Sequence, residues 1–142
     1  MPQVNLEEHN AREIASELML RLTQFNEAHA GSVRKRDVAL TVRSEDGVLI
    51  GGLTGELFWN ALYVHLLWVD EDYRHQRYGT MLLARAEQLA VEQSCTVAYL
   101  STFGFQAPGF YAGRGYSVIG ELADVPPGSK RQWFSKVLTA SE

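Results

Sequence analysis

The chain has 142 residues, enough for one domain with a core of ordinary size. Its composition, 46% hydrophobic and 21% charged, excludes a disordered or fibrous protein, and its formal net charge of −4 argues against a general nucleic-acid binder. The only cysteine is Cys95, which excludes an internal disulfide and a cysteine-based metal cluster. No apolar run has transmembrane length, and residues 1–8 lack the features of a signal peptide. We therefore expect a cytoplasmic protein with a single domain over residues 1–142 and no membrane partner.

The N-terminal part of the chain is predicted to be helical over residues 6–28, which are rich in helix formers. Apolar residues recur there at spacings of three and four, which predicts a face that packs against a core. The members of that stripe are Ile14, Leu18, Leu22 and Phe25. Residues 3–6 are predicted to add a short edge strand.

Three strands are expected to follow as an antiparallel meander. Residues 38–44 alternate between apolar and polar side chains, and residues 48–59 resume a strand pattern after the turn E-D-G. Residues 62–69, L-Y-V-H-L-L-W-V, come after a turn at Asn60 and are apolar on both faces. This pattern is typical of a central strand that is covered on both sides, with its side chains in the core.

The second half of the chain predicts a helix, a strand, a short helix and two more strands. The first helix is expected over residues 76–93 and the next strand over residues 96–103. A short helix is predicted to begin near Pro108, a residue that suits a first helical position. Residues 116–122 and 131–138 close the chain as strands, which gives a mixed α/β sheet.

A small cluster of positive charge, Y-R-H-Q-R-Y-G-T over residues 73–80, lies between the predicted strand 62–69 and the helix that follows. The first amides of a helix have no partners inside the helix, and together with the positive end of its dipole they can bind an anion. Gly79 would allow close approach of a phosphate, to which Arg74 and Arg77 could add charged contacts. On spacing alone, a solvated basic turn remains the alternative.

The stretch from residue 66 to residue 83 resembles motif A of the GNAT superfamily, the acetyl-CoA-dependent N-acetyltransferases. That pattern is R/Q-x-x-G-x-G/A after a strand that ends in an apolar triplet. Arg74 matches its first position and Gly79 its second glycine, whereas Arg77 stands in the place of the first glycine. This departure is tolerable if residue 77 has helical φ and ψ, because its N–H would then still point at the phosphate.

A second stretch, F-Q-A-P-G-F-Y-A-G-R-G-Y over residues 105–116, is similar to the superfamily's segment A-x-x-x-Y-x-x-x-G-F. The matching residues are Ala107, Tyr111, Gly115 and Tyr116. Gly104 stands where the family often has Asn, which puts one contact to pantetheine in doubt. The combination of L-Y-V-H-L-L-W-V (residues 62–69) with F-Q-A-P-G-F-Y (residues 105–111) resembles a bacterial subgroup whose substrate is unassigned.

The resemblance implies an α/β (α+β) fold with a mixed, mostly antiparallel sheet of six to seven strands flanked by helices. It also implies a V-shaped splay between the strands 62–69 and 96–103, past a bulge, with acetyl-CoA in the V and no metal. The positions it assigns to acetyl-CoA are Leu67, Trp68, Val69, Arg74, His75, Gln76, Arg77, Tyr78, Gly79, Thr80, Gly104 and Ala107. On the strand, the contacts would be made by the backbone, and the Val69 N–H would face the thioester oxygen.

The resemblance also places a general acid at Tyr111, which would return a proton to the departing thiolate; a buried structural tyrosine is the alternative. No base is assigned by the motif. His65 has a suitable intrinsic pKa, Glu56 lies on the preceding strand, and a water chain without a single base is equally open. A lone histidine in an apolar strand is otherwise a core residue. Cys95 is expected to be inert.

Several functions compete. We expect an N-acetyltransferase that acts on a primary amine, of a small molecule in preference to a protein because the short chain carries no peptide-binding domain, and it could be a homodimer. Aromatic walls around a cationic acceptor could come from Trp59, Tyr63, Trp68 and Trp133. The alternative is a non-catalytic acyl-CoA sensor, which the Arg77 departure and the missing base leave open. A nucleic-acid partner is disfavoured by net charge.

Overall fold

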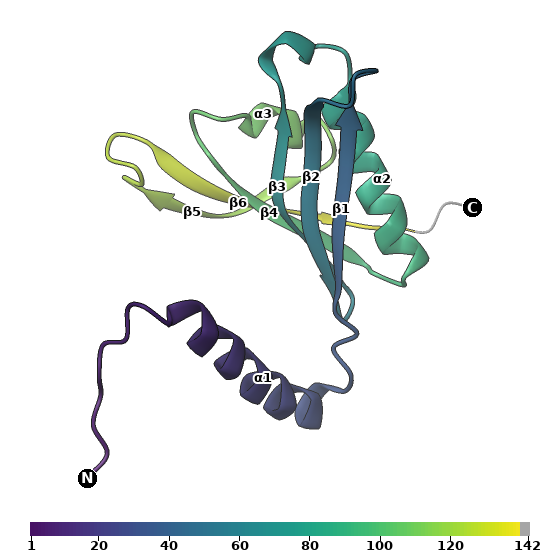
Figure 1. Cartoon of the computed structure of the whole chain (residues 1–142). Helices are drawn as coiled ribbons and strands as arrows, with labels where there is room; N and C mark the ends of the chain where they lie inside the picture. The colour runs from purple at the N-terminus through teal and green to yellow at the C-terminus, as the bar shows by residue number, and fades with distance from the viewer. Residues whose placement is uncertain (140–142) are drawn as a thin grey trace. The chain divides into compact units, whose positions relative to one another are not determined.

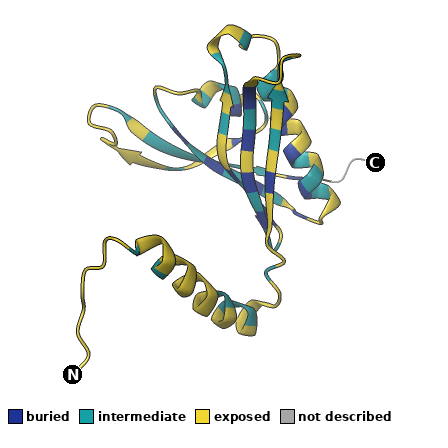
Figure 2. Cartoon of the chain, viewed as in Figure 1, coloured by how far each residue is buried: buried dark blue, intermediate teal, exposed yellow. Residues whose placement is uncertain are grey.

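The computed structural model describes residues 1–139 and consists of two compact units, Met1–Val33 and Arg34–Glu142 (Figure 1). The first unit contains one helix, α1 (Ala11–Ala30). It ends at Gly31, whose φ of 81° suits glycine and whose N–H donates to the Glu27 carbonyl. None of the helical residues is buried (Figure 2).

One prediction for this N-terminal unit is wrong, and another is not fulfilled within the unit itself. Residues 3–6 form no strand, because a strand needs a neighbour to satisfy its backbone and the unit offers none within residues 1–33. The apolar stripe of α1 is also not buried, with Leu18, Leu22 and Phe25 all exposed, since nothing within the unit covers it. Helical periodicity marks a face that can be buried, but burial itself requires a partner surface.

The second unit is built on a six-stranded sheet with the order β1-β2-β3-β4-β6-β5. Its strands are β1 (Arg36–Arg43), β2 (Leu49–Phe58), β3 (Ala61–Val69), β4 (Val97–Phe103), β5 (Ser117–Ala123) and β6 (Lys130–Val137). All neighbouring strands pair antiparallel except β3 and β4, which are parallel because a helix connects them. The predicted mixed, mostly antiparallel fold is confirmed.

The connecting helix, α2 (Tyr78–Glu92), packs on β1, β2 and β3 and buries one face of the sheet. Its buried residues recur at helical spacing and are Leu82, Leu83, Ala86 and Ala90. The sheet meets them with the alternate residues of its central strands, such as Leu62 and Leu100. A 3₁₀ turn, η1 (Glu71–Tyr73), precedes α2, and the short helix α3 (Pro108–Ala112) follows β4.

The Cys95 thiol is buried among these apolar residues, and its burial raises the pKa of the thiol, which makes it a poor nucleophile. None of the helices within residues 1–139 combines the length and apolarity needed to cross a bilayer.

Candidate active site

The central strands β3 and β4 separate part-way along their length. Only residues Ala61–Val64 of β3 pair with β4, opposite Val97–Leu100, although β3 continues to Val69 and β4 to Phe103. Beyond that point each strand is held on its outer side only, β3 by β2 and β4 by β6 (Figure 1). The predicted V-shaped splay is therefore present, and we call it the fork. It leaves a row of backbone groups of β3 and β4 without ladder partners.

A β-bulge opens the fork. In the β2–β3 ladder Gly55 pairs with Val64 and Thr54 pairs with Leu66, so that His65 is an extra residue without a partner. A bulge of this kind bends the strand that carries it and increases its twist. His65 is also the first residue of β3 beyond the last pair with β4, which identifies the bulge as the physical cause of the separation.

The fork directs backbone donors inward. The Asp70 N–H donates to the Ile50 carbonyl of β2 at 2.8 Å. Because adjacent residues of a strand point their N–H groups to opposite sides, the Val69 N–H points away from β2, into the fork. The same alternation directs the Leu67 N–H into the fork.

The side chains on this part of β3 are less buried than predicted. Leu67 and Val69 pack against the core, but Leu66 is 67% exposed and Trp68 is 48% exposed. Within residues 34–139, this segment is therefore covered on one face and not on both. The reason is that α2 covers only one face of the sheet within residues 34–139.

The loop between η1 and α2 offers a run of free amides. The N–H groups of residues 75–80 have no acceptor among residues 1–139, and the first helical bond runs from the Met81 N–H to the Arg77 carbonyl at 2.9 Å. His75 and Arg77 have positive φ, 64° and 69°. Successive amides in such a conformation form a concave nest that suits an anion, at the positive end of the helix dipole.

Arg77 does not have the helical φ and ψ under which an arginine would fit the motif without strain. It is the N-cap of α2, in the left-handed region (φ 69°, ψ 12°), and helix α2 begins at Tyr78, not at the predicted residue 76. Glycine adopts the left-handed region without a steric penalty, so this backbone has a conformation that suits glycine although the residue is an arginine.

Replacing Arg77 with glycine is expected to stabilise the protein by about 1 kcal/mol, because the left-handed conformation costs an L-residue roughly 1–2 kcal/mol and glycine gives back part of that as chain entropy. Urea unfolding of both proteins measures the difference. Gln76→Gly is the matched control in the same loop. Gln76 has no positive φ, so glycine relieves no strain there and should destabilise the protein. Equal destabilisation by both substitutions would contradict the strain at Arg77.

Arg74 connects the loop to the fork. Its Nε donates to the Val69 carbonyl at 3.1 Å, while the side chain remains exposed. The guanidinium is thereby fixed between the end of β3 and the free amides, with its other N–H groups available. His75, Gln76 and Arg77 are exposed, and Tyr78, Gly79 and Thr80 form the first turn of α2.

Arg114 is a second fixed cation at this turn, and the sequence reasoning missed it. Its Nε and Nη2 donate to Thr80 Oγ1 at 3.1 and 2.8 Å, and its guanidinium lies 4.9 Å from the centre of the Phe110 ring. A methyl group at Gly79 would lie 3.4 Å from that same ring. The charge of Arg114, next to the motif glycine Gly115, was the available signal, but only the fold shows which helix it reaches.

Tyr111 and Tyr116 lie side by side with different surroundings. The Tyr116 hydroxyl donates to Glu87 Oε2 at 2.8 Å, and burial together with that carboxylate raises the pKa of Tyr116 strongly. Tyr111 is buried among the rings of Phe110, Tyr116 and Phe134, and burial raises its pKa. Its hydroxyl has no hydrogen-bond partner among residues 1–139. One hydroxyl is thus committed to the structure, and the other is available.

The two candidate bases meet on the face of the sheet opposite α2. His65 Nε2 lies 3.8 Å from Glu56 Oε2, and Lys35 Nζ lies 3.5 Å from the same oxygen. The His65 side chain is 47% exposed, so this histidine is not the core residue that an apolar strand suggests. Tyr63, which lies two residues before His65 and pairs with Glu56 across the ladder, stacks on Tyr99 with ring centres 4.7 Å apart.

The loop after β4 contains the last two residues that were predicted to contact acetyl-CoA, Gly104 and Ala107. The Gly104 N–H donates to the Lys130 carbonyl at 2.8 Å, and Ala107 is the exposed N-cap of α3. The Gln106 side chain accepts from Thr102 Oγ1 and from the Phe103 N–H at 3.0 and 2.8 Å. These bonds close the loop on itself at the open end of the fork.

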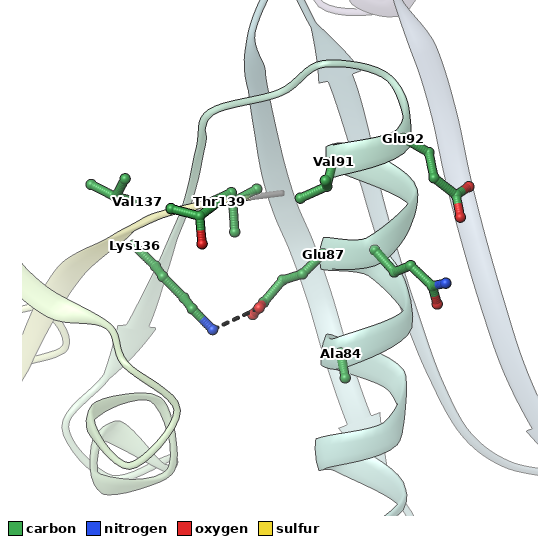
Figure 3. Close-up of a pocket in the computed structure, with 9 residues that line it drawn as sticks. Ala84, Glu87, Val91, Glu92, Lys136, Val137 and Thr139 are labelled. Carbon is green, nitrogen blue, oxygen red and sulfur yellow. Dashed lines mark hydrogen bonds and ion pairs between the residues drawn. The ribbon is translucent and has the colours of Figure 1, made fainter. Parts of the chain in front are cut away.

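A hollow of about 380 Å³ lies elsewhere, between the C-terminal half of α2 and the end of β6 (Figure 3). Glu87 and Lys136 face each other across it at 2.7 Å, with Val91 and Thr139 on its walls. The end of β6 pairs with the beginning of β4, the end of the sheet opposite the fork. The hollow shares no residue with the free amides or the fork, and we do not assign the chemistry to it.

Comparison with known proteins gives one family. Residues 5–116 match the model of the acetyltransferase (GNAT) family. The chain is 46% identical to blasticidin-S acetyltransferase of Streptomyces morookaense over 85 residues, 59% of this chain and 62% of that protein. It is 36% identical to acetyltransferase Atu2258 of Agrobacterium fabrum over 81% of this chain and 84% of that one.

A solved structure agrees with these matches. The crystal structure of an acetyltransferase from Bacillus cereus superimposes with a TM-score of 0.84 and 32% identity, over 96% of this chain and 98% of that one. The resemblance drawn from the two motifs is confirmed. The chain belongs to the acetyltransferase (GNAT) family.

Proposed function

We propose that the protein transfers an acetyl group from acetyl-CoA directly to a primary amine, and that the acceptor is a small molecule. The observation that carries this proposal is the fork in β3 and β4 beside a run of free amides at the start of α2. An extended chain with amide groups can bind between the two strands through the free backbone groups, while its phosphates sit on the amides of residues 75–80. Pantetheine and the pyrophosphate of CoA are such a pair.

Acetyl-CoA would be held mainly by backbone groups. Val69 and Leu67 offer N–H groups within the fork, and the charges of Arg74 and Arg114 are held near the start of α2, by Val69 and by Thr80. Trp68, Gly104 and Ala107 complete the predicted donor contacts, at the edges of the fork. Arg77, whose side chain is exposed, would contribute its backbone N–H first of all.

The chemistry requires one proton to leave the amine and one proton to reach sulfur. The Val69 N–H would donate to the thioester oxygen as negative charge develops there. Tyr111, protonated at neutral pH, would donate to the departing thiolate, whose conjugate acid has a pKa of about 8.5. An alkyl amine with a pKa of about 10 must first be deprotonated, by His65, by Glu56 or through water.

The small-molecule acceptor is supported by the name of one relative, blasticidin-S acetyltransferase, which the match covers over 62% of its length. We further propose that residues 1–142 act as a single N-acetyltransferase domain, as the family match beginning at residue 5 suggests. The cytoplasmic location, the homodimer and the exclusion of nucleic acid stay predictions.

Calorimetry with CoA tests the donor site. We expect one CoA per chain, and Arg74→Ala should weaken binding about 10-fold or more, since a hydrogen bond to a charged group contributes about 1.5–3 kcal/mol. Arg85→Ala, which removes an exposed charge in the middle of α2, is the matched control and should bind as the wild type does. Unchanged affinity in Arg74→Ala would remove that side chain from the site.

An acceptor screen with acetyl-CoA, which follows release of free thiol, separates the two functions. Turnover with any amine supports the transferase. Tight CoA binding without thiol release, over a broad panel of amines, would instead support the acyl-CoA sensor. That alternative is supported by the surroundings of the candidate bases, because Glu56 already lies close to both His65 and Lys35.

A further inference from the structure

The acceptor must approach the fork on the face that α2 leaves open, because α2 and its free amides occupy the other face. Tyr63 and Tyr99 alternate along their strands with residues that are buried in the core beneath α2, such as Leu62 and Leu100, so they lie on the open face, where their rings stack. His65 follows Tyr63 by two residues and contacts its ring, with centres 4.5 Å apart. Ser101 follows Tyr99 by two residues, and alternation along a strand places it on the same face. His65 and Ser101 are therefore the first residues of this face on either side of the fork.

Ser101 holds an arginine from the neighbouring strand. Arg131 Nε and Nη2 donate to Ser101 Oγ at 2.9 and 2.7 Å. The guanidinium lies 4.8 Å from the centre of the Trp133 ring and 5.6 Å from that of Phe103. The residue is partly buried in this arrangement. A fixed positive charge thus stands at the fork, opposite the Glu56–His65 pair.

Arg131 has no carboxylate partner among residues 1–139. The only acidic residue on β4, β5 and β6 is Glu121, and that carboxylate accepts from Lys130 at 3.2 Å and from Gln132 at 3.3 Å. A guanidinium carries five N–H donors, of which the contacts to Ser101 use two. The remaining donors form a planar edge that matches a carboxylate, and the rings and the serine have already fixed its position.

The opposite side of the fork has the complementary charge. Glu56 is the acidic group there, with 25% of its side chain exposed, and it already attracts the Lys35 ammonium. An acceptor amine that approaches the fork would find a carboxylate and an imidazole on one side and an unpaired guanidinium on the other. Aromatic rings lie beneath it, where Tyr63 stacks on Tyr99.

We propose that the acceptor carries a carboxylate as well as its amine, as an amino acid does, and that Arg131, held by Ser101, binds this carboxylate. The inference rests on the proposed transferase function and names the class of its acceptor. The amine would lie toward Glu56 and His65, which points the attacking nitrogen into the fork. A simple amine would lose the contact with Arg131 and bind more weakly.

The test compares acceptors that differ only in the carboxylate, by release of free thiol from acetyl-CoA. The panel pairs phenylalanine with phenethylamine, histidine with histamine and arginine with agmatine, within a screen of all the common amino acids. We expect kcat/KM to be at least about 10-fold higher for the carboxylated acceptors, which is the effect of one hydrogen bond to a charged group. Turnover of simple amines with no preference for a carboxylate would overturn the inference.

Variants of Arg131 link that preference to the residue. Arg131→Gln should lower kcat/KM for the preferred amino acid by about 10- to 100-fold, chiefly through KM, and leave the matched amine unchanged. Arg131→Lys should restore part of the loss. Arg43→Gln, which removes an exposed arginine on β1, is the matched control. An equal loss on both acceptors would mean that Arg131 only supports the sheet.

Two outcomes separate this inference from the function on which it rests. A wild-type protein that binds no CoA and releases no thiol would contradict the proposed function. A wild type that acetylates amines, with the same ratio between acceptors before and after Arg131→Gln, would contradict the inference alone. If Arg131→Gln does not fold, Ser101→Ala takes its place in the test. It keeps the charge of Arg131 and removes only the hydroxyl that anchors it, and it should reduce the preference for a carboxylate.

Discussion

Replacing Tyr111 with phenylalanine is expected to lower kcat by a factor of about 10² to 10⁴, the usual contribution of a general acid. The ring remains, so its packing against Phe110, Tyr116 and Phe134 should survive and the affinity for CoA should change little. The hydroxyl has no hydrogen-bond partner within residues 1–139, so its removal should leave the melting temperature nearly unchanged. Steady-state kinetics with thermal unfolding measures both quantities.

Tyr116→Phe is the matched control for that substitution. Its hydroxyl donates to Glu87, which also binds Lys136, and its loss leaves a partly buried carboxylate with one partner fewer. We expect a loss of stability of about 1–3 kcal/mol with little change in kcat. Tyr111→Phe should therefore lower kcat with little loss of stability, and Tyr116→Phe should lower stability with little loss of kcat. Full activity in Tyr111→Phe would refute its role, and another donor or water would then have to protonate the thiolate.

The pH profile gives an independent check on Tyr111. Burial raises the pKa of Tyr111 above its ordinary value of 10.0, because the buried site disfavours the charged phenolate. A pKa above 10.0 keeps the hydroxyl mostly protonated as the pH increases from 7 to about 9. Over that interval kcat should show no decline due to loss of this proton, and a decline below about pH 9 in the wild type would have to come from another group.

The largest structural effect is expected from Gly55→Ala. A methyl group at Gly55 would overlap the backbone carbonyl oxygen of Tyr63, directly across the bulge, and neither backbone can yield cheaply. Overpacking of this kind costs about 1–3 kcal/mol, and here relief requires the bulge to change shape. Since the bulge separates β3 from β4, we expect weaker CoA binding and a loss of activity in addition to the loss of stability.

Gly120→Ala provides the comparison for Gly55→Ala. Gly120 also lies in a strand and has no positive φ, but a methyl group there would meet no atom within 4 Å. It should be neutral or slightly stabilising, because alanine restricts the unfolded chain more than glycine does. Urea unfolding and CoA calorimetry on both variants measure the contrast. Wild-type CoA affinity in Gly55→Ala would contradict the role assigned to the bulge.

Much of the fold could be read from local pattern. Strand alternation in residues 38–59, the apolar run 62–69 and the stripe of α2 all reflect side-chain periods of two and of 3.6 residues, and these elements lie within a few residues of where they were predicted. The basic loop and Gly79 could likewise be identified from the sequence as a candidate phosphate site. An anion site at a helix start is a property of consecutive residues.

Contacts between distant residues were decided by the tertiary structure alone. Glu56 and His65 were separate candidates in the sequence, and the register of β2 and β3 brings them within 3.8 Å of each other. Arg114 and Thr80 are 34 residues apart, and Arg131 and Ser101 are 30 apart. No periodicity encodes such pairs, because they depend on strand order and on where two strands separate.

The sequence by itself thus determined most of the elements and the family, and it marked the start of α2 as a candidate anion site, since each of these depends on neighbouring residues in the chain. Long-range pairing decided the rest. It placed the bulge at His65, and within residues 34–139 it left one face of β3 uncovered so that Trp68 is exposed. Backbone conformation and burial at these positions follow from what packs against them, and that surface is assembled only when the whole sheet has formed.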